Sequence, residues 1–218
     1  MRKMKLFLTG TLIPAALFIS LTGCPNTPDP SVVEASLESS VIEENSELFI
    51  EDPNTAVVSF ETNDTKYTGQ YGYTLWTEGD AVQDPFTHLN VTLKKISGND
   101  VAGYGIIFGS HNNTMLIVLI NTNREFIIGE LTGNLFTKLQ EWIEVSSLKP
   151  GYNQSNIIDI SHNSVTGDFT LSFNGGDAVT FRDDEEPFHT TGKDGYMVVI
   201  SPLDVFPGIP VSITFKKN

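Results

Sequence analysis

The stretch FTLSFNGGDAVTF, residues 169–181, indicates the class of fold. Phe169, Leu171 and Phe173 alternate with small polar residues, which places three large apolar side chains on one face of a strand. The Asn-Gly and Gly-Gly pairs at 174–176 follow, and such residues tolerate the positive φ angles of a tight turn. A second short run, from Ala178 to Phe181, then begins. The stretch therefore predicts an antiparallel β-hairpin with one buried face.

Short apolar or alternating runs, separated by Gly, Asn, Asp and Pro, fill the chain from about residue 48 onward. The run at 115–120 is apolar on both faces and is expected in the centre of a sheet. Residues 135–145 are predicted as a strand, although Leu135, Leu139 and Trp142 also fit helical spacing. The pattern predicts an all-β fold, an antiparallel jelly-roll β-sandwich of about ten to thirteen strands. The other expected strands are 56–60, 71–75, 88–96, 104–108, 125–131, 156–161, 196–200 and 211–215.

The N-terminus, residues 1–23, is predicted to be a secretory leader. Three basic residues precede an apolar run at 6–21, which is shorter than the roughly 20 residues of a membrane span. Leu21-Thr22-Gly23-Cys24 then resembles the lipobox of bacterial lipoproteins. That resemblance implies cleavage before Cys24 and acylation of its thiol, so that the partner is a membrane, reached through a lipid anchor. The alternative is an ordinary secretory leader in which the cysteine is incidental.

Residues 24–46 are rich in Pro, Ser, Asn and Glu and are predicted to be a lipidated flexible tether, with the sandwich domain at 47–218. About 20 flexible residues span roughly 25 Å. Lipoproteins kept in the inner membrane carry Asp after the cysteine, and Pro25 stands there in this chain. The resemblance therefore favours an exported protein on the outer membrane or cell surface. Cys24 is the only cysteine, so the domain forms no internal disulfide.

The chain is strongly acidic. Its formal net charge is −14, and the leader holds three of the 13 basic residues and no acidic one, which leaves −17 for the remainder. Such a surface repels phosphates, so nucleic acid is not an expected partner. Membrane attachment is expected to come from the lipid alone.

Seven strands resemble those of the concanavalin A-like lectin/glucanase superfamily, nearest to its laminin G-like and keto-disaccharide hydrolase-like members. They are the strands at 104–108, 115–120, 125–129 and 156–160, with Phe169–Gly175, Gly195–Ile200 and Val211–Phe215. The resemblance spans about residues 55–218. It implies the jelly-roll fold, but the superfamily includes sugar binders, glycosidases and protein-interaction modules alike.

Retaining glucanases of this superfamily carry acidic residues at alternating positions on one strand, because two carboxylates must lie about 5 Å apart. No strand here has that pattern: Glu141 and Glu144 would point to opposite faces. The four histidines are dispersed, so no zinc site and no cofactor is expected. The acidic run Asp183–Glu186 could supply oxygen ligands to Ca²⁺, but a solvated loop is the preferred interpretation.

Candidate ligand-binding residues are the turn His111-Asn112-Asn113, which could hydrogen-bond to hydroxyl groups, and Trp76, which could stack on a sugar ring. A core position is the competing interpretation for Trp76. We expect a non-catalytic module that binds glycan or protein ligands. The alternatives are a saccharide hydrolase and a structural envelope lipoprotein.

Overall fold

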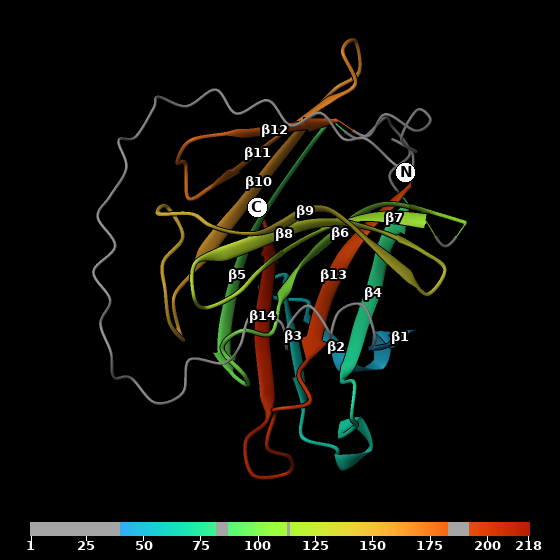
Figure 1. Ribbon diagram of the computed structural model, residues 1–218, viewed down its shortest axis with the longest axis vertical. Coiled ribbons are helices and arrows are strands. Elements are labelled where there is room, and N and C mark those ends of the chain that lie inside the picture. Colours follow the sequence, from blue (N-terminus) through green and yellow to red (C-terminus); the bar gives the residue numbers. More distant parts are fainter. Residues whose placement is uncertain (1–39, 82–86, 113, 183–191) are drawn as a thin grey trace.

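The computed structural model describes residues 40–81, 87–112, 114–182 and 192–218. Within these ranges the chain forms two seven-stranded sheets and two single-turn 3-10 helices, η1 (Ser46–Leu48) and η2 (Thr65–Tyr67) (Figure 1). In sheet A the strand order is β12 (Val179–Arg182), β11 (Asp168–Phe173), β10 (Asn156–Asn163), β5 (His88–Ser97), β14 (Val211–Lys217), β3 (Val57–Thr62) and β2 (Phe49–Asp52). In sheet B it is β1 (Val41–Glu44), β4 (Tyr73–Ala81), β13 (Lys193–Ile200), β6 (Tyr104–His111), β7 (Thr114–Ile120), β8 (Glu125–Thr132) and β9 (Leu135–Glu144).

The two sheets curl against each other as a jelly-roll sandwich, which confirms the predicted all-β fold. The described strands number fourteen, slightly above the predicted range. Every strand pair is antiparallel except β1 with β4, which run parallel. No helix in the described ranges is long and apolar enough to cross a bilayer.

The main core lies between the sheets and is built from the inward positions of alternating strands. Leu93 of β5, Phe173 of β11 and Phe215 of β14 are fully buried there from sheet A. Phe108 and Val118 face them from sheet B. Alternation along each strand thus determines which side chains the sandwich buries.

Sheet B also has a buried apolar layer on its other face. On β7, Leu116 and Val118 belong to the main core, whereas Ile117 and Leu119 belong to a second cluster, so the two sets point in opposite directions. This explains why the stretch 115–120 is apolar on both faces, and it confirms the predicted central position. Large side chains from β1, β4 and β9 pack against the second cluster, namely Ile42, Trp76 and Trp142.

The predicted hairpin after Phe173 is confirmed. Asn174 and Gly175 have φ angles of 52° and 72°, and β11 pairs with β12 across the turn. The Asn174 amide nitrogen donates to the carbonyl of Ser147 at 2.7 Å and to Oδ1 of Asn156 at 2.8 Å. Its Oδ1 accepts from the backbone N–H of Ile157 at 2.9 Å. One residue thus forms the turn and holds the β9–β10 connection to it.

The structure differs from the predicted strand set at the N-terminal side. Strands β1 and β2 are not in the predicted set, because each has four residues and half of them are acidic, VIEE and FIED. The β-structure therefore begins at Val41, before the expected domain boundary at residue 47. The ambiguous stretch at 135–145 is a strand, β9, which pairs with β8 along its length.

Candidate functional site

The predicted ligand-binding turn lies at the end of the β6–β7 hairpin. His111 is the last residue of β6 and Asn112 follows with a φ of 50°, and both side chains are exposed. Asn113 lies outside the described residues, as do Cys24 and the acidic run Asp183–Glu186.

Trp76 lies on β4, half-buried, and packs against the second apolar cluster of sheet B. It pairs across the sheet with Met197, which pairs with Gly105 on β6. Gly105 precedes His111 by six strand positions, or roughly 20 Å. The structure therefore does not bring Trp76 to the His111 turn, and these residues do not form one site.

The acidic residues of β9 are separate surface ion pairs. Glu141 lies 3.1 Å from Lys138, and Glu144 is paired with Arg124 from the β7–β8 connection. Both glutamate side chains are 61% exposed. The outward positions of the neighbouring central strands are aliphatic, with Ile117 and Ile127 as examples. Glu141 and Glu144 thus do not form the close carboxylate pair of a retaining glycosidase.

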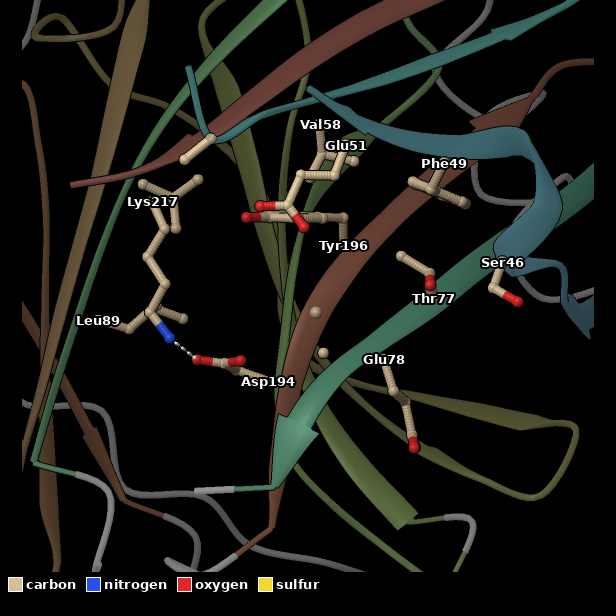
Figure 2. Close-up of a pocket in the computed structure, with 14 residues that line it drawn as sticks. Ser46, Phe49, Glu51, Val58, Thr77, Glu78, Leu89, Asp194, Tyr196 and Lys217 are labelled. Carbon is tan, nitrogen blue, oxygen red and sulfur yellow. Dashed lines mark hydrogen bonds and ion pairs between the residues drawn. The ribbon is translucent and has the colours of Figure 1, made fainter. Parts of the chain in front are cut away.

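A cavity of about 480 Å³ lies between the sheets, and we call it the inter-sheet pocket (Figure 2). Its walls come from β2, β3, β5 and β14 of sheet A and from β4 and β13 of sheet B. The volume lies within the range of roughly 300–1,000 Å³ that is usual for small-molecule sites. Its lining includes Phe49, Glu51, Val58, Leu89, Asp194, Tyr196 and Lys217.

The pocket occupies the place where the inward positions of the sandwich change from apolar to charged. On β14 the inward series Val211, Ile213 and Phe215 reaches Lys217 next. On β13 the inward residues Val198 and Tyr196 are preceded by Asp194.

Strand β2 makes the same change from Phe49 to Glu51, which both line the pocket. Ile50 between them points the other way and is 67% exposed to solvent. Glu51 is itself exposed, so its carboxylate is in contact with solvent as well as with the pocket.

The polar residues of the pocket are held in defined positions. The Lys217 Nζ atom lies 2.6 Å from Oδ2 of Asp194, which links the two sheets across the cavity (Figure 2). The Tyr196 ring stacks on Phe215 with a centroid separation of 4.6 Å. Glu78 also lines the pocket and is bound by Lys193 at 2.6 Å and by the Ser110 hydroxyl.

Burial raises the pKa of Tyr196 to about 12, and the negative charges of Asp194 and Glu51 act in the same direction. The phenol therefore stays protonated at neutral pH and remains a hydrogen-bond donor. Together with the Lys217 ammonium it supplies donors, while Glu51 and Asp194 supply acceptors. Leu89, Val58 and Phe49 add an apolar wall. The pocket can thus hold a small ligand that has both hydroxyl groups and an apolar surface.

The sequence contained a signal for this site that strand prediction did not use. Extending the period of two beyond Phe215 and before Tyr196 reaches Lys217 and Asp194. The signal from Glu51 depends on strand β2, which was not predicted. In the described ranges no three His, Cys, Asp or Glu side chains are grouped so that they could hold a metal ion.

No protein-family model matches the sequence, and no curated protein matches it. Solved structures do match. A β-glucanase from Bacillus licheniformis is 5% identical, with a TM-score of 0.50 over 80% of this chain and 85% of its own. The GH16 protein of the mixed linkage glucan PUL of Bacteroides ovatus, in complex with a G4G4G3G product, is 7% identical, with a TM-score of 0.50 over 83% of this chain and 90% of its own.

The carbohydrate-binding module CBM66 of Bacillus subtilis is 8% identical and has a TM-score of 0.48 over 77% of this chain and 87% of its own. At such identities the likeness concerns the fold alone. The fold is that of concanavalin A-like jelly-roll sandwiches.

Proposed function

We propose that this chain is an exported lipoprotein, held by acyl chains at Cys24, whose sandwich is a non-catalytic module that binds a saccharide. The proposed location is the outer membrane or cell surface. The observation that carries the binding function is the inter-sheet pocket, in which an aromatic and aliphatic wall meets charged residues at inward strand positions.

A pyranose ring suits this combination because it has apolar C–H faces and a rim of hydroxyl groups. The wall of Phe49, Val58 and Leu89 would pack against the apolar face. Glu51 and Asp194 would accept hydrogen bonds from hydroxyl groups, and Lys217 and Tyr196 would donate to them. The names of two structures with this fold, a β-glucanase and a GH16 protein with a glucan product, are consistent with a saccharide ligand.

The charges of the pocket favour a neutral saccharide over an acidic one. Glu51, Glu78 and Asp194 face a single lining lysine, Lys217. A uronic acid or a sulfated sugar would bring a further negative charge against these carboxylates. Such like-charge contacts exclude ligands efficiently.

The bonding of the carboxylates argues for binding without turnover. Asp194 is held by Lys217, and Glu78 is held by Lys193 and Ser110. Both carboxylates are thus already engaged by basic or hydroxyl groups of the protein itself. A hydrolase remains the competing function because of the glucanase neighbours, and the same experiment tests it.

The experiment presents the mature lipoprotein, solubilised in mild detergent, to an array of neutral and acidic glycans, and it assays the same sample for release of reducing sugar. We expect saturable binding to neutral glycans and no release. Glu51→Gln should weaken binding about ten- to a hundred-fold, since a hydrogen bond to a charged group contributes about 1.5–3 kcal/mol. The matched control is Glu61→Gln, an exposed glutamate on the solvent face of β3.

Three outcomes would contradict the proposal. Release of sugar that one Asp or Glu substitution abolishes would establish the hydrolase. Equal loss of affinity in Glu51→Gln and Glu61→Gln would remove the pocket as the site. Loss of affinity in His111→Ala or Asn112→Ala, with Glu51→Gln unchanged, would move the site to the turn predicted from the sequence.

The anchor is tested separately. Cys24→Ala should release the protein from the membrane fraction and leave the leader unprocessed or misprocessed. A membrane-bound and normally processed Cys24→Ala protein would refute lipidation.

A further inference from the structure

One end of the sandwich carries exposed apolar side chains on an ordered loop, which connects β13 to β14 and spans residues 201–210. Leu203, Val205 and Ile209 on this loop are 47%, 64% and 52% exposed. We call them the apolar tip, together with Tyr71 of the neighbouring β3–β4 connection, which is 52% exposed. The two connections extend to the same end of the molecule (Figure 1).

Hydrogen bonds hold the loop in this conformation. The backbone N–H of Ile209 donates to the carbonyl of Val205 at 3.0 Å. Asp204, the only charged residue of the loop, points inward and accepts from the N–H groups of Asn99 at 2.7 Å and Ser201 at 2.8 Å. The outward surface of the loop therefore carries no charge, although the chain as a whole is strongly acidic.

The N-terminal segment enters the domain at this same end. The backbone N–H of Val41, the first residue of β1, donates to the carbonyl of Gly72 at 3.2 Å. Gly72 follows Tyr71 and lies against Pro202, because a Cβ on it would be 3.1 Å from the Pro202 ring. The chain that leads back to Cys24 thus starts beside the apolar tip.

The inter-sheet pocket lies at the opposite end. Strand β14 begins at Val211, next to the loop, and ends at Lys217 in the pocket. Strand β13 runs the other way, from Asp194 in the pocket to Ile200 beside the loop. Six strand positions separate the two ends of β14, or roughly 20 Å.

We propose that the apolar tip rests on the lipid surface that carries the anchor, so that the inter-sheet pocket faces away from the membrane. The orientation builds on the lipid anchor put forward under the proposed function. Fifteen residues lie between Cys24 and Ser40, and a chain of that length reaches at most about 50 Å. A lipid anchor therefore keeps this end of the domain near the bilayer. Uncharged, aliphatic and tyrosine side chains are the ones that partition into the interfacial region.

The test uses the lipidated chain, in which an acylated Cys24 leaves no free thiol. Val205→Cys is labelled with a fluorophore sensitive to solvent polarity, and the protein is bound to phosphatidylcholine vesicles with or without lipids spin-labelled in the acyl chains. The matched control is Val165→Cys, because Val165 is 91% exposed in the β10–β11 turn at the far end. Both substitutions are at exposed positions, so both variants should fold.

We expect the label at position 205 to emit at shorter wavelength on vesicles and to be quenched by the spin-labelled lipids at least threefold more than the label at 165. Equal, water-like emission from both positions would overturn the orientation. So would a blue shift at 205 that rises with protein density and resists lipid quenching, because it would mean that a second copy covers the tip. A parent chain that takes up the label at Cys24 would refute the anchor itself, and the orientation with it.

Discussion

Lys95 provides the strongest test of the packing in this structure. It lies on β5, is 1% exposed, and its ammonium group donates to the carbonyls of Asn99 at 2.5 Å and Ala102 at 2.8 Å. Burial lowers its pKa from 10.5 to about 8, against the opposing influence of Asp204 and Asp100. Burial and the two carboxylates thus shift the pKa of Lys95 in opposite directions, and burial has the larger effect.

The sign of the pH dependence follows from that pKa. Between about pH 8 and 10.5 the folded protein has released the Lys95 proton while the unfolded chain still holds it, so stability rises with pH in this window. With 1.36 kcal/mol for each pKa unit, Lys95 should add about 2–3 kcal/mol to the free energy of unfolding between pH 7 and pH 10. Tyr196 and Tyr152, whose pKa values are raised to about 12, act in the opposite direction only above pH 10.

The assay is urea unfolding of the wild type and of Lys95→Met at pH 7, 8, 9 and 10, followed by circular dichroism. The variant has no group that titrates at this position, so the stability difference between the two proteins isolates Lys95. We expect that difference to change by about 2–3 kcal/mol in favour of the wild type as the pH rises. Lys216→Met, at an exposed lysine, should show no such change. A constant difference, or one that moves in favour of the variant, would refute the dominance of burial.

Two further predictions concern single positions, and a third concerns calcium. Gly195→Ala should destabilise the protein by at least about 2 kcal/mol in urea unfolding, because the new Cβ would overlap the carbonyl oxygen of Thr77. The control Gly208→Ala should be nearly neutral, and equal effects of the two substitutions would contradict the close approach of β13 to β4. Asn174→Ala should lower the free energy of unfolding by about 2–4 kcal/mol, because it removes three hydrogen bonds. The loss should exceed that of Asn153→Ala, a position that shares only the positive φ angle, and similar losses would mean that backbone strain alone determines the effect. Millimolar Ca²⁺ should leave the melting temperature of the mature chain unchanged, and a rise would assign a calcium site to the sequence Asp183–Glu186.

The alternation of apolar residues was sufficient to predict the sandwich, because each central strand buries one or two complete faces. Phe169, Leu171 and Phe173 are fully buried, as their spacing predicts. The short strands β1 and β2 carry no such pattern, since each lies at a sheet edge and its place depends on pairing with one neighbour, β4 or β3. Pairing at an edge is a property of the assembled sheet and leaves little trace in the local sequence.

The candidate site was harder to predict for a related reason. His111, Asn112 and Trp76 were selected by residue type, and the register places them on separate parts of sheet B. The pocket instead combines Glu51, Asp194 and Lys217 from strands far apart in the chain. Strand alternation could have assigned an inward direction to Asp194 and Lys217, but only the packing of the two sheets brings them together with Glu51.

The parallel pairing of β1 with β4 has a mechanical consequence. A pull transmitted through the preceding chain reaches the domain at Ser40 and is directed along β1, so it loads the bonds between the two strands together, in shear, and does not open them one by one. These include the bonds from Val41 to Gly72 and from Asn45 to Trp76, with the Ser40–Thr74 hydroxyl contact of 2.7 Å beside them. The pairing of β1 with β4 therefore bears this force first. Because β1 has only four residues, it should detach from β4 before the sandwich core unfolds.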